Sequence, residues 1–121
     1  MRDDKQNLIV GKTFEFSLNI IEFSEIIRGH NKFEMASQIF RSGTSIGANI
    51  REAQNAESLA DFIHKFKIAA KEADELEYWL GLCRDSIHYP SPNDELIGEL
   101  RSIILIISKI ISSSKRAKLS N

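Results

Sequence analysis

The strongest constraint on the fold is a row of apolar residues that recurs every three or four positions. The row runs through Phe62, Phe66, Ala69, Ala73, Leu76, Leu80, Cys83 and Ile87. Alternating steps of four and three place these side chains on one face of an α-helix, as in a coiled coil. The eighteen isoleucines favour strands by propensity, but the apolar residues follow helical steps rather than alternation. The sequence therefore predicts one long helix over residues 59–87.

Turn-forming residues are scarce and mark only a few boundaries. No proline precedes Pro90, and only six glycines are scattered over 121 residues, which argues against a β fold with many turns. The pattern predicts four helices with flexible termini, over residues 12–28, 32–56, 59–87 and 92–112. Short connections between such helices predict a single all-α domain over residues 1–121, an antiparallel up-and-down four-helix bundle.

Capping residues set the predicted helix ends. Gly29 suits the left-handed position that follows the first helix. An N-cap residue followed three positions later by an acid is typical of a helix start. The predicted starts are Asn31 with Glu34 for the second helix, Ser58 with Asp61 for the third, and Ser91 with Pro92 and Asp94 for the fourth.

The first predicted helix has two apolar stripes on nearly opposite sides. At 100° per residue, Phe14, Leu18 and Ile21 point one way. One stripe can line the bundle core, and the other needs a second partner, because exposed apolar patches mark interfaces. We expect the second stripe to contact another subunit. If it does not, Trp79 on the third predicted helix is the next candidate for the subunit contact. The alternative is that long neighbouring helices cover the first helix on both sides. The second stripe consists of Phe16, Ile20, Phe23 and Ile27.

Polar rows on the second and third helices predict a network between them. If the chain turns near Glu57 and Ser58, antiparallel residues whose numbers sum to about 115 lie level. Arg41 then lies near Glu75, and a guanidinium can bind a carboxylate with two hydrogen bonds. Separate solvated charges are the alternative. The predicted network consists of Gln38, Arg41, Asn49, Glu52, Glu72 and Glu75.

The second helix also contains Gly43 and Gly47, which disfavour a helix by about 1 kcal/mol each relative to alanine. A close approach of a neighbouring helix is the expected compensation.

Several kinds of chemistry find no support in the sequence. One cysteine, Cys83, forbids an internal disulfide, and the three histidines lack the spacing of a metal site. There is no glycine-rich nucleotide loop. We therefore expect no enzyme activity, no cofactor and no metal. The start of the chain has no apolar signal region and no apolar run approaches the ~20 residues that span a bilayer, so a cytoplasmic protein without membrane contact is expected.

The charge pattern bears on nucleic-acid binding. A formal net charge of −1 argues against a globally basic protein. A local patch is possible if copies assemble, and Lys115, Arg116 and Lys118 in the tail can contact phosphates without reading sequence.

One segment has the character of a family signature. Residues 38–53 read Gln-Ile-Phe-Arg-Ser-Gly-Thr-Ser-Ile-Gly-Ala-Asn-Ile-Arg-Glu-Ala, with further matches at residues 60–62 and 69–80. Over about residues 10–112 the chain resembles the bacterial four-helix bundle family named for proteins encoded in 23S ribosomal RNA intervening sequences. The resemblance implies a small up-and-down bundle that forms a homopentamer, with no enzyme activity assigned.

A related branch of this family suggests an alternative function. The accessory variability determinant of diversity-generating retroelements is a basic pentameric barrel that binds reverse transcriptase and nucleic acid, and this chain differs from it by a near-neutral charge. The leading interpretation is therefore a non-enzymatic oligomeric scaffold or adaptor with an unidentified protein partner. The alternative is an accessory protein that binds RNA or DNA, which clustering of Lys and Arg on one face would favour.

Overall fold

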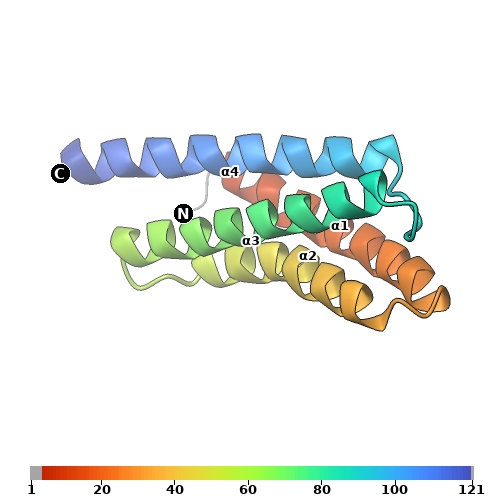
Figure 1. Ribbon diagram of the computed structural model, residues 1–121. Coiled ribbons are helices and arrows are strands. Elements are labelled where there is room, and N and C mark those ends of the chain that lie inside the picture. Colours follow the sequence, from red (N-terminus) through yellow and green to blue (C-terminus); the bar gives the residue numbers. More distant parts are fainter. Residues whose placement is uncertain (1–3, 121) are drawn as a thin grey trace.

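The protein is an all-α bundle of four antiparallel helices, as predicted (Figure 1). The computed structural model describes residues 4–120, with side chains from Leu8 onward. The helices are α1 (Asp4–Gly29), α2 (Phe33–Ala53), α3 (Leu59–Asp85) and α4 (Asp94–Ser120). Each helix packs against its two neighbours in the ring order α1, α2, α3, α4, and within these residues the backbones of the diagonal pairs do not approach each other closely.

The helix ends differ from the sequence prediction in both directions. α1 begins at Asp4 rather than at residue 12, and α4 runs to Ser120, through the segment that was expected to fray. Residues 1–3 and 121, part of the predicted flexible termini, lie outside the described range. α3 ends at Asp85, so Ile87 leaves the helical row and is 94% exposed. The last turns of α4 extend past the first turn of α3 (Figure 1).

One of the three predicted N-caps forms, and the other two and the left-handed position at Gly29 are wrong. The Ser58 hydroxyl accepts a hydrogen bond from the amide of Asp61 at 3.0 Å. Asn31 does not cap α2; it takes the left-handed conformation, with φ of 62°, that was expected at Gly29. Asparagine tolerates this conformation and can therefore end the turn that follows α1. α4 begins after Asn93 rather than after Ser91, and the Asn93 side chain accepts from the amide of Leu96 at 2.8 Å.

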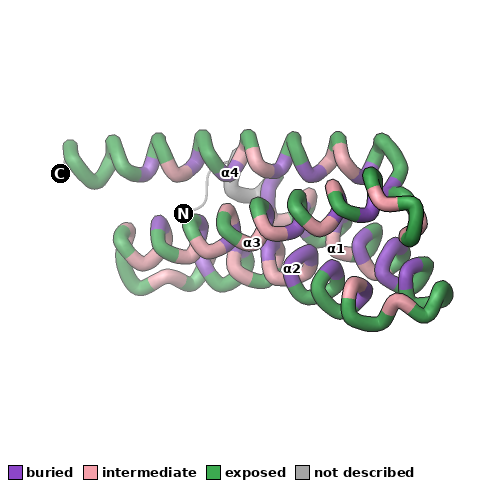
Figure 2. The backbone as a smooth tube through the Cα atoms, in the orientation of Figure 1, coloured by how far each residue is buried: buried purple, intermediate pink, exposed green. Residues whose placement is uncertain are grey.

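The core is a continuous apolar column between the four helices (Figure 2). The predicted α3 row fills one side of it, and Cys83 is completely buried there. Gly43 and Gly47 lie where α1 crosses α2, as expected. A Cβ atom on Gly43 would lie 2.6 Å from Cγ2 of Ile20, and one on Gly47 would lie 3.2 Å from the carbonyl oxygen of Thr13. The two glycines allow this close helix packing.

The structure reverses the assignment of the two α1 stripes. The stripe that was expected to contact another subunit is in the core of its own chain, with exposed fractions of 6% or less, and comprises Phe16, Ile20, Phe23 and Ile27. This stripe is the buried one because it is the longer of the two. Ile9 extends it toward the start of α1. The opposite stripe is interrupted by Glu25 and remains on the surface, where Phe14 is 56% exposed.

Candidate functional site

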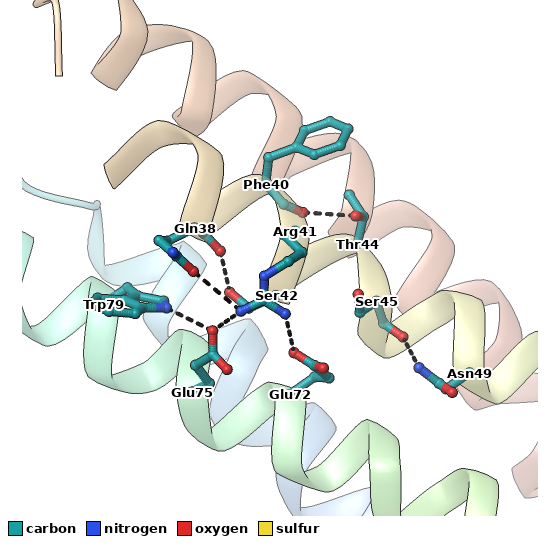
Figure 3. A network of polar contacts seen from close by, with 10 residues as sticks. All are labelled: Gln38, Phe40, Arg41, Ser42, Thr44, Ser45, Asn49, Glu72, Glu75 and Trp79. Atoms are coloured by element: carbon teal, nitrogen blue, oxygen red, sulfur yellow. Dashed lines mark hydrogen bonds and ion pairs between the residues drawn. The ribbon is translucent and has the colours of Figure 1, made fainter. Parts of the chain in front are cut away.

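A polar network joins α2 to α3 on one flank of the bundle (Figure 3). Arg41 reaches from α2 toward two carboxylates one turn apart on α3. Its Nη1 donates to Oε1 of Glu72 at 3.1 Å, and its Nη2 donates to Oε2 of Glu75. Gln38 accepts from Nη2 at 3.3 Å, and the indole of Trp79 donates to the same Glu75 oxygen at 3.1 Å. The predicted pairing of Arg41 with Glu75, with Glu72 nearby, is therefore present.

The network is half-buried, and this limits what it can do chemically. The Arg41 side chain is 48% exposed, and those of Glu72 and Glu75 are 20% and 35% exposed. Both carboxylates already accept hydrogen bonds from a fixed cation, so the arrangement resembles an interhelical clamp more than a general base awaiting a substrate. Its direct effect is to hold α2 and α3 in register.

Two residues predicted to join the network lie elsewhere. Asn49 donates to the carbonyl oxygen of Ser45 in its own helix at 2.9 Å. Glu52 pairs with Lys65 at 3.0 Å, a contact that raises the pKa of the lysine. At a rise of ~1.5 Å per residue, Asn49 and Glu52 lie about 12 and 16 Å from Arg41 along α2, beyond the reach of its side chain.

Trp79 joins the network, a role that was not predicted. From the sequence it is expected only as a subunit contact, although it follows Glu75 by four positions, the spacing at which side chains meet on a helix. The ring is partly buried against the core and edge-on to Tyr78, with centroids 5.3 Å apart. Much of its surface is thus already used within the chain.

An apolar surface groove lies between α1 and α2. Phe14, Leu18 and Phe40 are each about half exposed there, and Figure 3 shows Phe40 pointing away from the polar network. We call Phe14, Leu18, Phe40 and the groove residues the α1–α2 outer face. The groove has a volume of about 270 Å³ and is lined by Val10, Phe14, Ser17, Thr44, Gly47, Ala48 and Arg51.

Other chemistry-bearing groups are dispersed. Within the described residues, no cluster of three or more His, Cys, Asp or Glu side chains is placed to hold a metal ion. Burial raises the pKa of the Cys83 thiol to about 11, which disfavours the nucleophilic thiolate. None of the helices in the part of the chain that the structure describes is long and apolar enough to cross a membrane.

Comparisons with known proteins found one matching family model and a similar solved structure. The family model for the 23S rRNA-intervening sequence protein matches residues 5–113. A crystal structure of a protein of unknown function from the S23 ribosomal protein family of Bacteroides thetaiotaomicron is 40% identical in sequence. The alignment covers 89% of this chain and 98% of the other, with a TM-score of 0.81. The search of curated proteins gave no match.

Proposed function

Because the chain belongs to the 23S rRNA-intervening sequence protein family, we propose that it acts as a non-enzymatic, oligomeric scaffold or adaptor in the bacterial cytoplasm. It binds through surfaces rather than through a catalytic pocket. Five copies is the number that the family resemblance favours. The buried, unpaired Cys83 is consistent with a reducing compartment.

The observation that carries this proposal is the α1–α2 outer face. A soluble monomer normally leaves single apolar residues exposed, whereas here two phenylalanines and a leucine gather beside an apolar groove. Covering each half-exposed phenylalanine removes on the order of 100 Å² from water, or about 2.5 kcal/mol at ~25 cal/mol per Å². Several such side chains per copy can offset the cost of association.

The clamp at Arg41 supports the same proposal. It fixes α2 against α3 from the side of α2 that is turned away from Phe40 (Figure 3). A rigid helix loses little conformational freedom when a second copy docks on it, which favours binding. The clamp therefore holds in place α2, the helix that contributes Phe40 and four of the seven groove residues to the outer face.

Light scattering coupled to gel filtration tests the proposal. The 13.7 kDa chain is expected to elute as an assembly, of about 68 kDa for five copies. Phe14→Glu combined with Leu18→Glu is expected to give monomers, because charged groups would be forced into an apolar contact. Both residues are on the surface of the chain, so the helical circular dichroism should be retained.

Leu105→Glu is the matched control, because Leu105 on α4 is 55% exposed and lies outside the outer face. It should leave the assembly intact. A wild-type chain that runs as a monomer at micromolar concentration contradicts the proposal. Equal dissociation by Leu105→Glu places the contact on another face.

A further inference from the structure

The end of α4 carries a feature that the scaffold role does not use. The last turns of this helix extend past the bundle and are exposed (Figures 1 and 2). The buried row of α4 ends at Ser114, and Lys118 follows one turn later where the core has ended. A lysine can occupy this position because its ammonium group reaches water.

A cleft with three lysines opens between this end of α4 and the start of α3. Its volume is about 210 Å³. The polar groups come from both helices, so they face a shared hollow rather than one convex helix surface. Ile63 is 6% exposed and forms part of the apolar floor. We call this site the basic cleft, and it is lined by Ala60, Ile63, His64, Lys67, Lys115 and Lys118.

The cleft is positively charged because the end of α4 that lines it contains no acidic residue. No Asp or Glu follows Glu99, whereas five Lys and Arg residues do. None of the six lining residues is acidic. On α3, the negative charge of Asp61 acts on Lys65, which is also paired with Glu52 outside the cleft, so a single neighbouring acid stands against the three lysines of the lining. The net charge of −1 therefore conceals a local excess of positive charge.

We propose that the basic cleft binds the phosphodiester backbone of a nucleic-acid strand. Lysine ammonium groups neutralise phosphates as point charges, and contacts of this kind position a strand without reading its bases. The apolar floor supports the lysine stems while the charged ends face the strand. A lipid surface fits less well, because interfacial binding requires a broad apolar face beside the charges, and this cleft is concave. The site goes beyond the scaffold role and does not depend on it.

Fluorescence anisotropy with a labelled oligouridylate measures this binding. In the variant Lys67→Ala/Lys115→Ala/Lys118→Ala, affinity at low salt should fall about tenfold or more, since the phosphate contacts dominate. The slope of log K against log salt should become shallower by about 2, because each lost contact contributes roughly 0.7 on a single strand. Circular dichroism and light scattering on the same variant separate this loss from unfolding or dissociation.

The matched control removes the same charge elsewhere, as Lys12→Ala/Arg101→Ala/Lys109→Ala. This variant should keep the affinity and the salt slope of the wild type. The proposal is overturned if both triple variants weaken binding equally, if polyglutamate displaces the RNA as well as unlabelled RNA does, or if the wild type fails to bind at low salt. Retention on anionic vesicles without RNA binding would likewise assign the cleft to lipid. None of these results bears on the oligomeric state, which light scattering reports separately.

Discussion

Gly43 is the position where a single methyl group gives the sharpest test of the packing between α1 and α2. In a helix, Gly→Ala normally stabilises a protein by about 1 kcal/mol, because alanine loses less backbone freedom on folding. Here the added Cβ would lie 2.6 and 2.8 Å from the two Cγ atoms of Ile20, which is fully buried. Those atoms are close to the backbone of a stiff β-branched side chain, so they cannot rotate away.

Whether Gly43→Ala raises or lowers the stability depends on the cost of overpacking compared with the gain in helix propensity. Overpacking a core costs about 1–3 kcal/mol, and two contacts at the root of Ile20 place Gly43→Ala in the upper half of this range. After the helix-propensity gain of about 1 kcal/mol is subtracted, the variant should be less stable by about 1–2 kcal/mol. The urea midpoint should fall by about 0.5–1 M for a typical dependence on denaturant.

Urea unfolding at one fixed protein concentration measures this effect, because assembly would otherwise shift the midpoint. Gly98→Ala is the control, since Gly98 lies on α4 with no atom within 4 Å of its added Cβ, and it should be stabilising. In the Ile20→Ala background the two Cγ atoms are absent and only Cβ of residue 20 remains close, at 3.1 Å, so Gly43→Ala should lose most of its destabilising effect. If Gly43→Ala stabilises the wild-type chain as much as Gly98→Ala does, the close approach of α1 to α2 is refuted.

Three further predictions concern the clamp, the α3 cap and the buried thiol. Arg41→Ala should lower the free energy of unfolding by about 1–2 kcal/mol. This value lies between those for exposed and buried ion pairs, because Glu72 is 20% exposed, and an unchanged urea midpoint would contradict it. Ser58→Ala should cost about 1 kcal/mol in the same assay, whereas Ser58→Thr, which keeps the hydroxyl, should cost much less. The pKa of Cys83 is raised from 9.0 to about 11, so the unfolded chain loses the thiol proton first. Stability should therefore fall by about 2 kcal/mol more in the wild type than in Cys83→Ala between pH 9 and 11, and parallel pH profiles would contradict this.

The fold followed from periodicity, whereas the helix ends did not. On α2 and α3, alternating steps of three and four residues determine which face is buried, and this holds whatever ends the helix. On α1, which has two apolar stripes, the period alone does not decide between them. Ends depend on which side-chain oxygen reaches a free amide, and local spacing offers several candidates. Ser91 and Asn93 both precede α4, and the structure uses Asn93. Similarly, the turn after α1 uses Asn31 rather than Gly29 as its left-handed residue.

The clamp was predictable because antiparallel pairing fixes which positions are level. The turn near Ser58 placed Arg41 opposite Glu75, and the structure joins them. For the other predicted members of the network, lying on the same helix face as Arg41 was not enough to bring them into contact with it. Asn49 and Glu52 share the face of Arg41 but lie two to three turns away, so they find closer partners. Axial distance, as well as helical angle, decides which polar residues form one network.

The sequence predicted that Lys115, Arg116 and Lys118 can contact phosphates, but it did not predict the basic cleft, because residues 113–120 were expected to fray. A flexible tail would not hold Lys115 and Lys118 opposite Lys67, whereas a continuous α4 does. The available signal was the absence of acids after Glu99, which the net charge of the whole chain obscures. Charge counted along each helix is therefore more informative here than charge counted over the domain.

The two proposed surfaces lie on opposite sides of the bundle, and this has a consequence for assembly. In the ring order of the helices, the α1–α2 pair is opposite the α3–α4 pair. If the surface that receives the α1–α2 outer face of the next copy is not the α3–α4 side, each basic cleft stays open to solvent in the assembly. Several clefts on one particle would bind one strand more tightly than a single cleft does, because each further contact becomes intramolecular. The monomeric variant Phe14→Glu/Leu18→Glu should then bind a long oligouridylate more weakly than the wild type, yet bind a short one equally well. Equal loss for both lengths would show that the outer face itself contacts the strand.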